Sequence, residues 1–175
     1  EIPEAENPEA PVKPLGEEDE FVADTLIESD LELLLPPDYV PETSERIALY
    51  RQIDSLDSES EVAEFSKNLV DRFGKIPEVT AELLRIPLLR RLARKLGVEK
   101  VMLKQDKMFI HFVDKSNRAY YNSHAFGKIL NYVAGAGARC TFRERDEKCS
   151  IVVSNVKSVK SALDIFTRMS GLSPI

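Results

Sequence analysis

The 175-residue sequence contains no tryptophan, only two cysteines and only two histidines. Cys140 and Cys149 are too few for a disulfide framework or a zinc site, and we expect both to be reduced thiols. His111 and His124 have no cluster of other metal ligands near them, which makes a metalloenzyme an unfavoured interpretation. No apolar run approaches the ~20 residues of a membrane span, and no signal peptide is recognisable. We therefore expect a cytoplasmic protein with no membrane partner.

The sequence also lacks the motifs of the common nucleotide-dependent and nucleophilic enzymes. Gly135 and Gly137 lie close together, but they are not followed by the Lys-Ser/Thr pair of a phosphate-binding loop. They also lack the third glycine of a dinucleotide-binding turn, so we interpret them as the end of a helix. Neither histidine accompanies a serine or cysteine nucleophile in a recognisable motif. These absences predict that the chain is not an enzyme and that it binds no cofactor and no metal.

Acidic residues are concentrated at the start of the chain. The formal net charge is −6, but residues 1–24 contain nine acids and one base, so residues 25–175 have a net charge of +2. The first 20 residues contain four of the ten prolines and few large apolar side chains, so they cannot bury enough surface to offset their ordering entropy. We interpret 1–24 as an acidic, proline-rich linker from an upstream domain, with a solvated tail as the alternative. The absence of an initiator methionine favours the linker and an excised fragment, and we expect 25–175 to form one folded domain.

The first predicted helix begins at Thr43 or Ser44, either of which can cap its start. Large apolar or aromatic residues then recur three residues apart, which is typical of one buried helical face. These residues are Ile47, Tyr50, Ile53 and Leu56.

Two further helices follow directly. Ser58 and Glu61 fit a capping box at the start of the second, and Gly74 fits the position just past its end. Pro77 suits the first turn of the third helix, which carries a leucine-rich face. Pro87 lies inside this third helix and removes one backbone hydrogen bond, so we expect a kink or a break there.

The apolar pattern alternates in the rest of the chain, which indicates strands. In the hairpin at 101–112 the alternation places His111 on the face opposite Met108, Ile110 and Phe112, toward solvent. The remaining expected elements are a strand within Thr25–Leu35, a helix over Ser123–Ala134, a second hairpin from Cys140 that turns at Asp146-Glu147, and a last helix from about Val156 to Met169. This order predicts an α+β fold with a mainly antiparallel sheet, built from an N-terminal strand and two hairpins and packed with about five helices.

The segment Asp71-Arg72-Phe73-Gly74 ends the second predicted helix. A helix end explains three of its four residues, because a cation suits the helix dipole there, Phe73 packs and Gly74 terminates the helix. Asp71 is not explained, because the dipole disfavours an acid at the carboxyl end of a helix.

A basic stretch runs from Arg85 to Lys107. Its charges either contact nucleic-acid phosphates or form the solvated face of a helix whose leucine face is buried. No aromatic stacking platform is interleaved with these bases, and the solvated face is the favoured interpretation. The bases are Arg85, Arg90, Arg91, Arg94, Lys95, Lys100, Lys104 and Lys107, against Glu99 and Asp106.

Three ordered motifs resemble one protein family. LLPPDYVPETSERIALYRQI, LVDRFGKIP and LLRRLARKLGVEK together resemble the C-terminal domain of bacterial transcription-repair coupling factors. The resemblance covers about Asp24 to Val113 and fades over residues 114–175. Members of that family are multidomain, ATP-dependent DNA translocases that remove stalled RNA polymerase and recruit the nucleotide-excision-repair protein UvrA. The resemblance implies that residues 1–24 are the linker from the upstream motor.

The resemblance also implies a regulatory role. In the family this domain packs on a UvrB-like module of the same protein and covers the UvrA-binding surface. That contact uses charged residues around the DRFG helix end, which match Asp71 and Arg72 here. The family can carry an acid three residues before the aspartate, where this chain has Asn68. We therefore expect Asn68, Asp71 and Arg72 to form a partner-binding site, and we keep a nucleic-acid-binding accessory domain that uses Arg85–Lys107 as the alternative function.

Overall fold

A computed structural model of the chain describes residues 21–171, and residues 1–20 of the linker expected from composition lie outside this range. The five strands of the described part are β1 (Leu26–Ser29), β2 (Val98–Lys104), β3 (Lys107–Asp114), β4 (Cys140–Arg145) and β5 (Lys148–Ser154). Its helices are α1 (Thr43–Ser55), α2 (Glu59–Phe73), α3 (Glu78–Lys95), α4 (Arg118–Tyr121), α5 (His124–Ala136) and α6 (Val159–Met169), with a short 3₁₀ turn, η1 (Gly137–Arg139).

The five strands form one sheet in the order β1-β2-β3-β5-β4, in which only the β1–β2 pair is parallel. This confirms the α+β class and the mainly antiparallel sheet expected from the sequence. Both hairpins turn where the alternation predicted. Gln105 and Asp106 adopt φ of 52° and 60°, and Asp146 adopts φ of 55°. Such left-handed residues give a two-residue loop the twist that antiparallel strands need.

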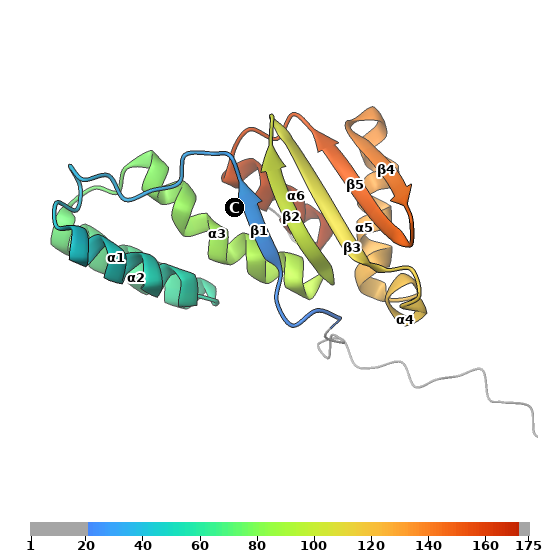
Figure 1. The fold of residues 1–175 in the computed structure, drawn as a ribbon, viewed down its shortest axis with the longest axis horizontal. Helices are drawn as coiled ribbons and strands as arrows, with labels where there is room; N and C mark the ends of the chain where they lie inside the picture. Colours follow the sequence, from blue (N-terminus) through green and yellow to red (C-terminus); the bar gives the residue numbers. More distant parts are fainter. Residues whose placement is uncertain (1–20, 172–175) are drawn as a thin grey trace, which may run out of the picture.

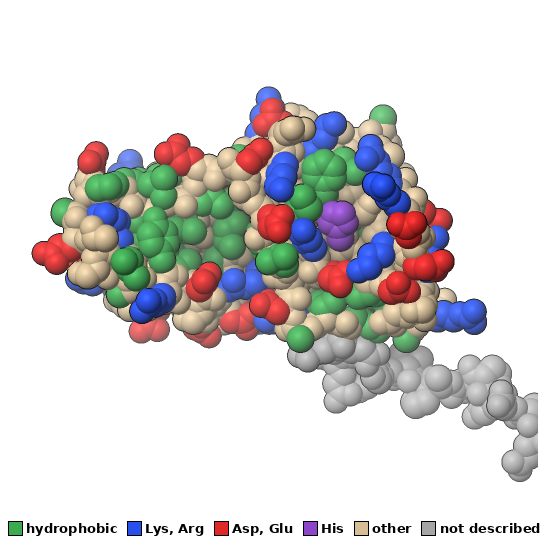
Figure 2. Space-filling view, in the orientation of Figure 1, with side chains coloured by type: hydrophobic (Ala, Val, Ile, Leu, Met, Phe, Trp, Pro, Cys, Tyr) green, Lys and Arg blue, Asp and Glu red, His purple; other side chains and the backbone are tan. Residues whose placement is uncertain are grey.

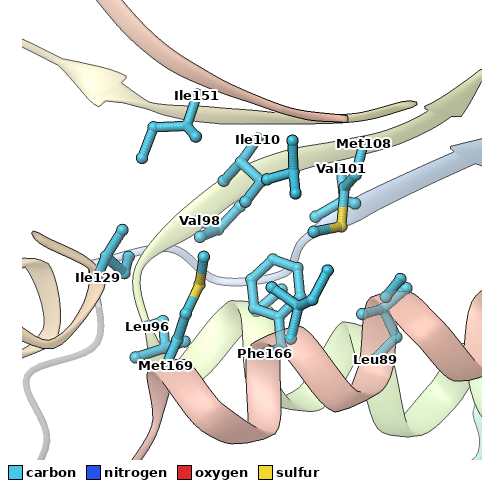
Figure 3. Packing of buried hydrophobic residues seen from close by; sticks show 14 of the residues in the cluster. Leu89, Leu96, Val98, Val101, Met108, Ile110, Ile129, Ile151, Phe166 and Met169 are labelled. Carbon is cyan, nitrogen blue, oxygen red and sulfur yellow. The ribbon is translucent and has the colours of Figure 1, made fainter. Parts of the chain in front are cut away.

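The main core lies between the sheet and the helices α3, α5 and α6 (Figure 1). Met108, Ile110 and Phe112 of β3 are fully buried, while His111 faces the opposite side, as the alternation predicted. Figure 3 shows side chains of β2, β3 and β5 pointing toward Phe166 and Met169 of α6 and Leu89 of α3. The sheet therefore has one buried face and one face without a described helix (Figure 1).

A second, smaller core joins α1, α2 and the first half of α3, at the left of Figure 1. Two partly buried polar contacts attach the chain between β1 and α1 to these helices. The Tyr50 hydroxyl accepts a hydrogen bond from the Leu35 amide at 2.7 Å, and the Thr80 hydroxyl donates to the Leu34 carbonyl at 2.8 Å. Leu84 belongs to the small core and Leu89 to the main one, so α3 connects the two cores.

Three local features differ from the sequence-based expectations. Helix α3 continues through Pro87 without a break, because burial of Leu84 and Leu89 on either side of the proline outweighs one missing hydrogen bond. Ile47 is 47% exposed, whereas Leu49 is buried, so the inner face of α1 is rotated from the expected one. The four-residue helix α4 was not expected, since it is too short to show a period.

A close contact under the sheet fixes the connection from α3 to β2. Gly97 adopts φ of 71°, and a Cβ atom there would lie 2.3 Å from the Tyr120 ring. The Tyr120 side chain is fully buried, and its hydroxyl donates to the Leu96 carbonyl at 2.9 Å. Gly97 is therefore required both by its backbone conformation and by the space that Tyr120 occupies.

Candidate interaction site between helices α1 and α2

The start of α2 is fixed by local capping. The Ser58 hydroxyl accepts a hydrogen bond from the Glu61 amide at 3.1 Å, as the capping box predicted. The Glu61 carboxylate reaches back to the Asp57 amide at 3.3 Å, one residue before the position expected. This start points Val62, Phe65 and Leu69 into the small core, and that orientation determines which residues face α1.

The end of α2 is fixed by Gly74 and Tyr39. Gly74 adopts φ of 85° directly after the helix. The Tyr39 hydroxyl donates to the Gly74 carbonyl at 2.9 Å and lies 3.3 Å from the Leu69 carbonyl. Burial raises the pKa of Tyr39 above its ordinary value, which favours the protonated hydroxyl that donates this hydrogen bond.

The three residues predicted from the sequence lie on one side of α2. Asn68, Asp71 and Arg72 have the i, i+3, i+4 spacing of neighbours on a helix surface. They line one shallow, open groove of about 240 Å³ between α1 and α2. Its other lining residues are Leu49 and Gln52 of α1 and Phe65 and Leu69 of α2. The groove thus has an apolar floor and a polar, charged rim.

Arg72 is held by contacts within the domain. Its guanidinium donates to the carboxylate of Glu45 on α1, and its central carbon lies 4.7 Å from the centre of the Phe73 ring. The Arg72 side chain nevertheless remains 55% exposed. It therefore joins α1 to α2 and also presents a positive charge at the groove.

Asp71 and Asn68 are exposed and make no side-chain hydrogen bond or ion pair with residues 21–171. Asp71 lies two residues before the last residue of α2, where the partial negative charge of the helix end opposes a carboxylate. The described part of the domain thus offers no contact that stabilises this acid. Its charge remains available to a partner.

Sequence reasoning missed the part of the site that belongs to α1. Glu45, Leu49 and Gln52 meet the DRFG helix end only because α1 packs along α2. Their spacing of four and three residues is a signal of a common helix face. The apolar residues that recur from Ile47 predict a different buried face of α1, and this prediction obscured the spacing.

The structure divides the basic stretch Arg85–Lys107 between two surfaces. On α3, Arg90 donates to the carbonyls of Asp54 and Leu56 at the end of α1, both at 3.0 Å, and Arg94 pairs with Asp57 at 2.9 Å. These arginines hold α3 to the small core. Arg85 likewise pairs with Glu78 and Glu82 of its own helix. The lysines of β2 and β3 instead lie on the sheet.

Other candidate sites are not assembled in the described residues. Within 21–171 no group of three or more His, Cys, Asp or Glu could hold a metal ion. Cys140 and Cys149 are free thiols, and they face Val153 and Glu144 rather than each other. No helix in this range has the length and apolar character to cross a membrane.

A family model described as the TRCF domain matches residues 29–123. The chain belongs to the TRCF domain family. The matched range contains α1, α2, α3, β2 and β3, and so includes the whole groove. It also extends ten residues beyond the region in which the sequence motifs showed the resemblance.

Curated relatives support the same assignment. The transcription-repair-coupling factor of Escherichia coli K12 is 36% identical over 93 residues, which are 53% of this chain and 8% of that protein. The one from Haemophilus influenzae is 35% identical over 128 residues, 70% of this chain and 11% of that protein. The chain therefore spans about a tenth of the length of these relatives.

The fold has also been seen before. A crystal structure of the C-terminal domain of a transcription-repair coupling factor superposes with a TM-score of 0.68 at 21% identity and covers 85% of this chain and 94% of that one. At this identity the likeness shows the fold alone. It confirms that the small helical core and the five-stranded sheet belong to one known architecture.

Proposed function

We propose that this chain is a non-catalytic regulatory domain of a transcription-repair coupling factor. In this proposal the α1–α2 groove packs on a UvrB-like module of the same protein and masks its UvrA-binding surface. The full-length protein is a cytoplasmic, ATP-dependent DNA translocase that removes stalled RNA polymerase and recruits nucleotide excision repair. The acidic segment 1–24 is the linker from the motor.

The observation that carries this proposal is the position of Asp71. An acid at the carboxyl end of a helix weakens that helix unless another contact compensates. No such contact exists within residues 21–171, and the side chain lines an open groove beside Asn68 and Arg72. A basic group on a partner surface would stabilise Asp71 where the domain itself does not.

The groove has the composition of a small docking surface. Leu49, Phe65 and Leu69 form its floor, and the polar rim surrounds them. An interface with an apolar centre and a charged rim gains most of its energy at the centre, while the rim selects the partner. Because Asp71 and Arg72 have opposite charges, the groove selects a partner with complementary charges in one orientation.

An inhibitory contact of this kind works by differential stability. A domain holds a closed state only through contacts that the open state lacks. The groove would supply such contacts in the closed state, and Arg72 already contacts Glu45 in the domain without a partner. Separation of the groove from its partner therefore breaks no contact within the core of the domain.

The test is a binding titration between the 175-residue chain and the UvrB-like module of the same protein. We expect Asp71→Arg to weaken this binding by about tenfold, a loss of ~1.4 kcal/mol. Asp54→Arg is the matched control, because Asp54 is also exposed in the last turn of a helix but does not line the groove. Equal affinities of the two variants would contradict the proposed site.

A further inference from the structure

The face of the sheet that lies opposite the helices has an ordered surface of its own. The strand registers place its side chains in two rows that cross all five strands. One row is Glu28, Met102, Phe109, Val152 and Thr141. The next row is Leu26, Lys100, His111, Ser150 and Arg143. No described helix covers these rows (Figure 1), and we call them the open face.

Two aromatic rings stand side by side at the centre of the open face. Phe109 and His111 are two residues apart on β3, so their side chains leave the same face about 7 Å apart. Both residues are half-buried. They line one hollow of about 580 Å³ that extends over β5 to Arg143 of β4.

Charged side chains of both signs border these rings. Figure 2 shows a histidine and hydrophobic side chains over the strands, with Lys and Arg side chains and some Asp and Glu side chains around them. Lys100 and Arg143 are in the same row as His111, and Lys104 and Lys107 lie at the turn between β2 and β3. Towards the other end of the strands lie Arg145 and Lys148, together with the acids Asp114, Asp146 and Glu147.

Glu28 is the acid within these two rows, and its ion pairs with two lysines are weak. Glu28 lies 3.4 Å from Lys100 and 3.7 Å from Lys104, and all three side chains are at least 32% exposed. Exposed ion pairs of this kind contribute little free energy, so the two lysines can exchange Glu28 for another anion.

From this arrangement we propose that the open face binds single-stranded nucleic acid. Two successive bases stack on Phe109 and His111, and the flanking phosphates contact Lys100, Lys104, Lys107 and Arg143. Sheet surfaces with exposed aromatic rings and a cationic border bind single strands in this way, because every base offers a face for stacking. An acidic polypeptide would contact the same lysines and arginine, but it would not need the paired aromatic rings.

This inference goes beyond the function proposed for the α1–α2 groove, with which the open face shares no residue. It also changes the site of the nucleic-acid alternative. Arg85, Arg90 and Arg94 of α3 are engaged within the domain, so in this proposal the phosphate contacts come from the sheet lysines and from Arg143, which lies outside the basic stretch.

The test is fluorescence anisotropy of the 175-residue chain with a labelled 12-nucleotide oligothymidylate, titrated at salt concentrations from 50 to 200 mM. The double variant Lys100→Gln/Arg143→Gln should weaken binding about tenfold and reduce the slope of log K against log salt by about 1.4, or ~0.7 per phosphate contact. Phe109→Leu should weaken binding about tenfold through lost stacking. Glu28→Gln should tighten binding about threefold, because it removes the acid that competes for two lysines.

A matched control is Arg91→Gln/Lys95→Gln, which removes the same charge from α3 and should leave affinity within twofold. Circular dichroism checks that each variant is folded, and His111→Ala replaces Phe109→Leu if the latter is not. The proposal is overturned if no binding is measured at 50 mM salt, or if the control weakens binding as much as Lys100→Gln/Arg143→Gln. It is also overturned if polyglutamate competes as well as unlabelled oligothymidylate while the ring variants bind normally, since the face would then recognise acidic polymers of any kind.

Discussion

Exchanging the charges of Arg72 and Glu45 would separate the contact that Arg72 makes within the domain from its proposed role in partner binding. Arg72 is 55% exposed and Glu45 is 27% exposed, so their pair is a surface ion pair worth about 0.2–1 kcal/mol. The contact of Arg72 with the Phe73 ring adds about 0.5–1 kcal/mol. Arg72→Glu should therefore destabilise the domain by about 1–2 kcal/mol, which lowers the melting temperature by roughly 3–6 °C for a domain of this size.

The exchanged variant, Glu45→Arg with Arg72→Glu, restores the attraction between α1 and α2. Its melting temperature should recover only in part, because the contact with Phe73 is still missing and each exchanged charge now opposes the dipole of its own helix. Binding to the UvrB-like module should stay about tenfold weaker, since the groove still has the wrong charge at position 72. The assays are thermal unfolding followed by circular dichroism and a binding titration. If the exchange restores binding together with stability, Arg72 acts only within the domain and our reasoning about it is refuted.

Three further predictions concern the fold. Gly97→Ala should cost about 3 kcal/mol and lower the melting temperature by about 6–12 °C, because it adds strain at positive φ and a contact with the Tyr120 ring; a loss under 2 °C would contradict this. Ser58→Ala should cost about 1 kcal/mol through the lost cap of α2, and a loss of 3 kcal/mol in urea unfolding would show that Ser58 does more than cap the helix. Burial, and next the nearby Lys100, lower the pKa of His111, so its contribution to stability is present above the ordinary histidine pKa and is lost as pH falls through the folded pKa. In unfolding measurements at pH 5–7, the stability of His111→Gln should therefore decline less as the pH falls. A decline as steep as that of the control variant His124→Gln, which keeps His111, would contradict the assignment.

Much of the sheet could be predicted from sequence because alternation is a local signal. Met108, Ile110 and Phe112 determine the buried face of β3, and the count of residues between β2 and β3 determines their turn. The order of strands could not be predicted in the same way. That β5 rather than β4 lies next to β3 depends on packing across the sheet. The rows that bring Arg143 level with His111 were therefore visible only in the structure.

The candidate site shows the same division. Asp71 could be recognised from sequence because the dipole of its own helix makes an acid there unexpected. The contact between Arg72 and Glu45 could not, because it depends on the way α1 packs along α2. The face of α1 was misplaced for a related reason. Ile47 and Leu49 are both apolar, and contact with α2 rather than local pattern decides that Leu49 is buried.

The most direct test of the proposed regulation is UvrA binding by the full-length protein in the absence of ATP. A shift from 99% closed to 99% open takes about 5.5 kcal/mol, so the Asp71→Arg/Arg72→Glu variant should open the protein only in part. We expect the variant to capture clearly more UvrA than the wild type in a pull-down, while Asp54→Arg captures no more. UvrA capture at the wild-type level by a folded Asp71→Arg/Arg72→Glu variant would contradict the claim that this groove masks the UvrA-binding surface.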